Sequence, residues 1–283
     1  MSRQLLLVFA ALLGVRSAFV TRPPQVVCDQ VQLNSCTDSF LKFIGFNYSN
    51  TNLWKDYKPL YNYMTSQMSA DIGKPDKLVN VCNGLEQFLG CLTFDGFKRC
   101  MTTKGLVAMG VDVDNAFKIE GTINQFNFEC GPGFFTAITE NFQCIQRVTK
   151  HFNTTLEKCR QTYFTNLLHG DPNKKCDYMK ELACCYSMPF DRAQCRLAER
   201  ADRWWACESQ IAFAVPQNPE CHFDCSDFFD YRESTGPRKV CREGHYKKLD
   251  SGHMFKMPDT YKEVSDGDWQ LTEGEWITEA EMI

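Results

Sequence analysis

The sequence lacks any apolar run long enough to cross a membrane as a helix, which takes about 20 residues. The first such run, residues 5–15, is too short, and no later run approaches that length. Histidine is scarce, with five residues, and none stands in the His-Glu-x-x-His pattern of zinc proteases. The Gly-x-Ser-x-Gly turn of α/β-hydrolases does not occur either. We therefore predict no membrane span, no enzyme, no cofactor and no metal site.

An excess of basic residues is also lacking, because 31 Lys and Arg face 35 Asp and Glu, for a net charge of −4. Domains that bind nucleic acid are usually basic, so we expect no nucleic-acid partner. Residues 231–256 are polar and rich in Lys and Arg, whereas residues 263–283 hold seven acidic residues and no basic one. Low hydrophobicity and charge of one sign predict that the tail, residues 231–283, is disordered.

The N-terminus has the features of a secretory signal peptide. Arg3 precedes the apolar run, and small residues around Ser17 form a cleavage zone. We expect residues 1–17 to be removed and the mature chain to be secreted into the extracellular space. Two N-glycosylation sequons follow, at Asn47 and Asn153, and both asparagines should therefore lie on the surface.

Cysteine is abundant, and all 16 cysteines lie beyond the cleavage zone. In an oxidising compartment an even number of cysteines indicates disulfides. Cys221 and Cys225, together with Cys241 and His245, could alternatively be drawn as a zinc site. We favour disulfides because secreted thiols oxidise. The predicted half-cystines are Cys28, Cys36, Cys82, Cys91, Cys100, Cys130, Cys144, Cys159, Cys176, Cys184, Cys185, Cys195, Cys207, Cys221, Cys225 and Cys241.

Two stretches carry the same cysteine frame, which indicates an internal duplication. The first two cysteines of each frame are 9 residues apart and the last two are 30 apart. The frames are Cys82, Cys91, Cys100 and Cys130, and Cys176, Cys185, Cys195 and Cys225. We predict one unit over residues 28–143 and a second over residues 144–230, with most disulfides formed inside a unit.

Apolar spacing predicts a mainly α fold, in which each disulfide-rich unit is a helix-turn-helix and the acidic tail is disordered. The expected helices are residues 28–46, one that starts at Asp76 and breaks near Phe94, and one from Pro132 to about 152. Thr154 and Glu157 form a capping box before another helix, and Pro189 restarts a further one. Residues 105–128 are the least regular stretch.

The tail carries three candidate sites. Ser251 precedes Gly252 near acidic residues, so it is a candidate for glycosaminoglycan attachment. An ordinary loop serine is the alternative. Trp269 and Trp276 stand at matching places in a short repeat, and two such aromatic anchors are typical of a motif that docks on a partner. A duplication without function would leave the same pattern.

Residues 81–91 with Cys100, and residues 175–186 with Cys195, resemble the cysteine-rich domains of nematode secreted proteins. Of these domains, the sequence is most similar to the chondroitin proteoglycan 4 type, and the alternative is a related uncharacterised nematode secreted domain. This resemblance covers about residues 28–230. It implies secretion, helices, disulfides and extracellular-matrix roles, and it implies no enzyme.

Our first hypothesis is a secreted, N-glycosylated, non-enzymatic binding or matrix protein with an extracellular protein or polysaccharide partner. An extracellular carrier of a small apolar ligand is the alternative, because the 22 Phe residues could line a cavity between pinned helices. A secreted hydrolase with residues dispersed along the chain is the third hypothesis.

Overall fold

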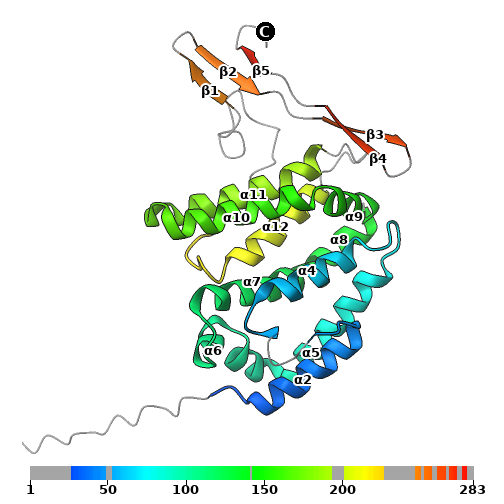
Figure 1. Ribbon diagram of the computed structural model, residues 1–283, viewed down its shortest axis with the longest axis vertical. Coiled ribbons are helices and arrows are strands. Elements are labelled where there is room, and N and C mark those ends of the chain that lie inside the picture. Colours follow the sequence, from blue (N-terminus) through cyan, green and yellow to red (C-terminus); the bar gives the residue numbers. More distant parts are fainter. Residues whose placement is uncertain are drawn as a thin grey trace, which may run out of the picture.

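The structure is a computed structural model that describes residues 27–48, 53–140, 142–192 and 201–225. It also describes the strand residues 246–249, 252–256, 260–265, 268–272 and 276–278. The predicted signal peptide lies outside these residues. The described body is helical and rich in disulfides, as the sequence predicts (Figure 1).

The first predicted unit contains seven described helices, which are α2 (Gln30–Ile44), α4 (Tyr57–Met68), α5 (Asp76–Cys100), α6 (Thr103–Ala108), α7 (Val113–Cys130), α8 (Pro132–Glu140) and the start of α9 (Phe142–His151). The second contains the rest of α9, α10 (Asn153–His169), a 3-10 turn η1 (Pro172–Lys174), α11 (Lys175–Arg192) and α12 (Ala201–Ala214). In Figure 1, α2 and α5 lie at one end of the body, α10 and α11 lie at the other, and α4 and α7 lie between them.

Helix α2 shows how local sequence sets an element. The Asp29 carboxylate accepts hydrogen bonds from the backbone N–H groups of Val31 and Gln32, at 3.0 and 3.1 Å, and so caps the helix. Gly45 ends the helix at a φ of 75°, a left-handed conformation that glycine adopts without strain. Between these ends the buried residues recur at helical spacing and face α5. The predicted helix over residues 28–46 is thus confirmed.

Helix α5 is kinked at Thr93, where φ is 62° and ψ is 166°. The kink lies one residue before the break predicted at Phe94. The kink changes the direction of the chain between Cys91 and Cys100, and these two cysteines form disulfides with different cysteines. Cys91 bonds to Cys36 on α2, whereas Cys100 bonds to Cys28 just before α2.

Disulfides join cysteines of the same predicted unit in all six bonds between described residues. In the first unit they are Cys28–Cys100, Cys36–Cys91 and Cys82–Cys130. In the second unit they are Cys159–Cys185, Cys176–Cys221 and Cys207–Cys225. Their Cα–Cα distances run from 4.8 to 6.0 Å, the range of ordinary disulfides.

The two units share part of their bonding pattern. The second cysteine of each frame bonds to an earlier helix of its unit, Cys91 to α2 and Cys185 to α10. The first cysteine of each frame bonds to a cysteine at or beyond the C-terminal end of a later helix of its unit, α7 in the first unit and α12 in the second. This partner is Cys130 in the first unit and Cys221 in the second. The fourth cysteines of the two frames have different partners, because Cys130 bonds to the first cysteine of its frame whereas Cys225 bonds to Cys207.

One hydrophobic core runs through both units. Helix α7 of the first unit packs against α12 of the second. Gly121 of α7 makes a close approach possible, because a Cβ added there would lie 2.3 Å from the backbone oxygen of Phe213. The boundary predicted at residue 143 therefore separates two bonding patterns within a single packed body.

Three details of the helices differ from the predictions. The irregular stretch of residues 105–128 is mostly the helix α7. Pro189 does not start a helix but lies inside α11, which continues to Arg192. The capping box of Thr154 and Glu157 does not form, since α10 begins after Phe152 with no side-chain cap.

Five short strands are described within residues 231–283. They are β1 (Tyr246–Leu249), β2 (Gly252–Lys256), β3 (Thr260–Ser265), β4 (Asp268–Thr272) and β5 (Trp276–Thr278). β1, β2 and β5 form one antiparallel sheet, and β3 and β4 form a second. Aromatic and β-branched residues, which favour strands, recur in these segments.

Candidate functional site: a polar groove over a buried arginine

A groove of about 580 Å³ lies between α4 and the junction of α9 with α10. Helix α4 contributes one long face to the groove, because its lining residues follow one another at intervals of one, three and four positions, which lie on one side of a helix. The lining residues are Tyr57, Lys58, Tyr61, Asn62, Thr65, Ser66 and Ser69 from α4 and its C-cap, and Thr149, Lys150, Asn153, Thr154 and Glu157 from the facing helices. Two of these twelve residues are tyrosines, and each of the other ten carries an aliphatic hydroxyl, an amide or a charged group.

The floor of the groove is formed by buried side chains and its rim by exposed ones. Tyr57 and Tyr61 are 4% and 6% exposed, and Thr149 is buried beside them. The rim residues are exposed: Lys58, Asn62, Ser66, Lys150, Asn153 and Thr154. A ligand in this groove would therefore meet polar groups first and the edges of two tyrosine rings beneath them.

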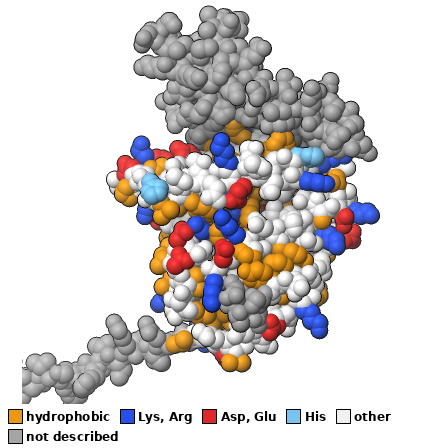
Figure 2. Space-filling model, in the orientation of Figure 1, with side chains coloured by type: hydrophobic (Ala, Val, Ile, Leu, Met, Phe, Trp, Pro, Cys, Tyr) orange, Lys and Arg blue, Asp and Glu red, His pale blue; other side chains and the backbone are white. Residues whose placement is uncertain are grey.

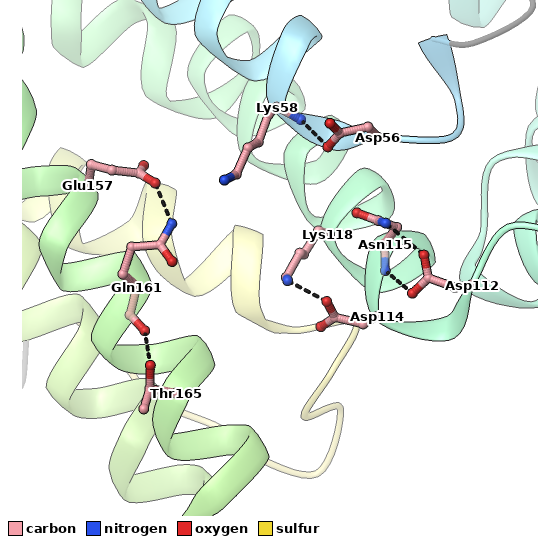
Figure 3. A network of polar contacts seen from close by, with 9 residues as sticks. All are labelled: Asp56, Lys58, Asp112, Asp114, Asn115, Lys118, Glu157, Gln161 and Thr165. Carbon is pink, nitrogen blue, oxygen red and sulfur yellow. Dashed lines mark hydrogen bonds and ion pairs between the residues drawn. The ribbon is translucent and has the colours of Figure 1, made fainter.

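Burial raises the pKa of Tyr57 above its ordinary value, and the charge of Glu157 raises it further. The phenol therefore keeps its proton and can donate a hydrogen bond. Glu157 accepts a hydrogen bond from the Gln161 amide at 2.5 Å, which holds the carboxylate on the α10 wall. Figure 3 shows Lys58 extending from α4 toward Glu157.

Charged side chains of both signs continue beyond the groove toward α7. Lys118 pairs with Asp114 one turn away, and its ammonium lies 4.2 Å from the centre of the Phe164 ring. Asp112 caps α7 through Asn115, as Figure 3 shows. The surface where α4, α7 and α10 meet is thus mixed in charge rather than strongly acidic or basic (Figure 2).

Arg160 lies directly beneath the floor of the groove and is fully buried, at 0% exposure. Its guanidinium stacks 4.0 Å from the centre of the Tyr61 ring and 4.2 Å from that of Phe213. Its Nε donates to Gln210 at 3.1 Å, and one Nη donates to Gln125. The charge is thus held by aromatic faces and amide oxygens, which recover part of the cost of burying it.

A carboxylic acid completes this buried network. Gln125 donates from its amide nitrogen to Glu129 at 2.7 Å, so one amide bridges the guanidinium and the carboxyl group. Burial raises the pKa of Glu129 to about 7, although Gln125 and Arg160 act in the opposite direction. One oxygen of Glu129 and one nitrogen of Arg160 have no hydrogen-bond partner among the described residues. The network lies in the core, so it can stabilise or tune the fold but cannot contact a ligand in the groove.

The structure describes some of the predicted site residues and not others. Cys144 and Cys184 are disulfide-bonded like the cysteines above, whereas Cys195 and Cys241 lie outside the described residues. Asn47 and Asn153 are both exposed, as predicted from their sequons. Ser251 lies outside the described residues, and Trp269 and Trp276 lie on β4 and β5, where only the backbone is described.

Sequence reasoning missed the groove and the buried arginine. The groove joins α4 to α10 across about 90 residues of chain, so no local pattern indicates it. Arg160 did leave a signal: Leu156, Tyr163 and Phe164 stand four, three and four residues from it, which is the spacing of one helix face. An arginine on the apolar face of a helix indicates a buried cation.

Comparison with known proteins identifies no relative. No family model matches the sequence, and no curated protein or solved structure matches it either. Within the described ranges, no helix is long and apolar enough to cross a membrane. No group of three or more metal-ligating side chains occurs in the part of the chain that the structure describes.

Proposed function

We propose that this protein is a secreted, N-glycosylated, non-enzymatic binding or matrix protein, and that the groove beside α4 binds a segment of an extracellular polysaccharide. The polar lining of the groove is the observation that carries this proposal. Hydroxyl and amide groups along both walls can exchange hydrogen bonds with a hydroxyl-rich chain, and Lys58 and Lys150 on the rim can pair with its acidic groups.

The disulfide framework supports a binding role. Five helices are tied to one another by covalent bonds: α2 to α5, α5 to α7, and α10 to α11. Of these, α10 forms a wall of the groove, and a wall that is fixed before binding loses little conformational freedom when a ligand arrives, which favours affinity. Disulfides also suit an oxidising extracellular compartment.

The carrier and hydrolase hypotheses fit this groove less well. A carrier of an apolar ligand needs an enclosed cavity of hydrocarbon side chains, whereas this groove is open to solvent and presents hydroxyl, amide and charged groups beside its apolar surface. A hydrolase usually needs a pair of carboxyl groups or an activated nucleophile at its substrate, and the residues that line this groove include one carboxylate, Glu157, and no histidine or cysteine.

Binding of oligosaccharides tests the groove. The test uses the secreted protein with Thr155→Ala, which removes the sequon at Asn153 and keeps the asparagine, so that no attached glycan fills the groove. Calorimetric titration with chondroitin and neutral chito-oligosaccharides should detect binding, and Ser66→Trp should weaken it at least tenfold by filling the groove. Ser39→Trp is the matched control, because Ser39 is an exposed serine on α2 whose hydroxyl donates to a helix carbonyl, as that of Ser66 does.

No binding of any oligosaccharide to the Thr155→Ala protein would refute the groove as a polysaccharide site. Equal weakening by Ser66→Trp and Ser39→Trp would also refute it. The intact mass of the secreted protein, before and after N-glycanase and chondroitinase, tests the other parts of the proposal. A chondroitinase-sensitive mass would assign a glycosaminoglycan chain, for which Ser251 is the candidate site.

A further inference from the structure

Asn153 belongs to two features at once. It is the acceptor of the sequon Asn153-Thr154-Thr155, and it lines the groove opposite α4. It is exposed at the start of α10, and its side-chain amide has no hydrogen-bond partner among the described residues. The amide nitrogen that would carry a glycan is therefore available and stands at the edge of the groove.

We propose that an N-linked glycan on Asn153 folds back into the groove, packs along α4 and closes the groove to other ligands. Attachment transfers an oligosaccharide from its lipid-pyrophosphate donor. The bond from the sugar C1 to the pyrophosphate oxygen breaks, the bond from C1 to Asn153 Nδ2 forms, and that nitrogen gives up one proton. The first sugars then lie within reach of the groove walls.

The chemistry of the facing wall suits this occupant. Asn62, Thr65, Ser66 and Ser69 present an amide and three hydroxyl groups along α4. The hydroxyl groups of Ser66 and Ser69 donate to backbone carbonyls of α4, at 2.7 and 3.3 Å. The Ser66 oxygen also accepts from the Gln67 amide at 3.5 Å, and because a hydroxyl oxygen has two lone pairs, both serines can still accept from a sugar hydroxyl. The volume of about 580 Å³ is that of a small-molecule site and accommodates the first sugars of a glycan.

Covalent attachment makes weak contacts sufficient. A short tether holds its ligand at an effective concentration in the millimolar range, so contacts that would give a free sugar only millimolar affinity fill the groove for a large part of the time. The attached glycan would then compete with a free polysaccharide. This step rests on the proposed function, whereas the packing of the glycan in the groove does not.

Asn47 provides an internal comparison. It follows the C-terminus of α2, is exposed, and is not among the residues that line the groove. Its neighbours Phe46 and Tyr48 stack on each other, with ring centres 5.3 Å apart. A glycan on Asn47 should therefore extend into solvent, on the same molecule and under the same conditions.

The rate of glycan removal tests the proposal. Native glycosylated protein is treated with N-glycanase, and release from each asparagine is followed by peptide mass spectrometry. We expect release from Asn153 to be at least tenfold slower than from Asn47, and the two rates to become equal after reduction and denaturation. Ser66→Trp should remove the difference in the native protein, because it occupies the groove, and Ser39→Trp should keep it.

Equal native rates at the two sites, or a protein without a glycan on Asn153, would overturn the proposal. Slow release from Asn153 that persists in Ser66→Trp would overturn it too, because the protection would then come from the helix itself. If Ser66→Trp is not secreted, Asn62→Trp replaces it, since Asn62 is an exposed rim residue one turn earlier on α4. These rates are measured without any added polysaccharide, so their outcome is separate from the binding test above.

Discussion

The buried carboxyl group Glu129 should make the stability of this protein fall as the pH rises. Its pKa is about 7 in the folded protein, against an ordinary value of 4.5. The folded state thus binds a proton more tightly than the unfolded state, and the free energy of unfolding decreases with pH between these two values. The contribution is fully present below about pH 4.5, and its loss is complete above about pH 7.

The substitution Glu129→Gln removes this titration and keeps the oxygen that accepts from the Gln125 amide. From the two pKa values, the wild-type protein should lose about 3 kcal/mol relative to Glu129→Gln between about pH 4 and pH 8. Burial of Glu208 also raises its pKa, but this residue is present in both proteins and cancels from the comparison.

Urea unfolding of both proteins across this pH range measures the difference. Glu86→Gln is the control, because it removes an exposed carboxylate from α5. A difference between wild type and Glu129→Gln that does not change with pH would refute the reasoning. It would mean that Arg160, through Gln125, keeps the buried carboxylate ionised throughout.

Three further predictions concern packing and bonding. Gln146→Leu should cost about 2 kcal/mol or more, seen as a lower melting temperature, because the Gln146 amide holds the turn between α4 and α5 through Gly73 N–H and three carbonyls. Gly121→Ala should cost about 1–3 kcal/mol in urea unfolding, since its Cβ would lie 2.3 Å from a backbone oxygen of α12, whereas Gly90→Ala, with open space around it, should not destabilise. Replacing Cys36 and Cys91 by serine should cost about 4 kcal/mol for a 55-residue loop, and an unchanged urea midpoint would contradict the bond.

The buried network of Arg160, Gln125 and Glu129 explains why apolar spacing did not predict helix α7. Helix α7 buries Thr122, Gln125 and Glu129 on the same side as its apolar residues, so its apolar face looks interrupted. These polar groups are tolerated because α10 and α12 bring Arg160 and Gln210 to the same place. No property of residues 105–128 alone indicates that partner.

The C-terminal segment shows what an average over composition leaves out. Its acidic charge is a property of the whole segment, whereas strand pairing depends on short stretches such as Thr260–Ser265 and Asp268–Thr272. Asp266 and Gly267 separate these two stretches, and Asp-Gly is a favoured pair between hairpin strands. Average charge over 50 residues does not register a signal of this length.

The sequence by itself determined the helical class, the break in α5 and the grouping of disulfides within two units. Each of these follows from local spacing, because helical periodicity and the order of cysteines are written along the chain. The tertiary structure alone decided that Cys176 bonds to Cys221, that α7 joins the two units, and that a groove lies beside Asn153. These features depend on which helix faces meet, and that is set by the packing of side chains that are far apart in the sequence.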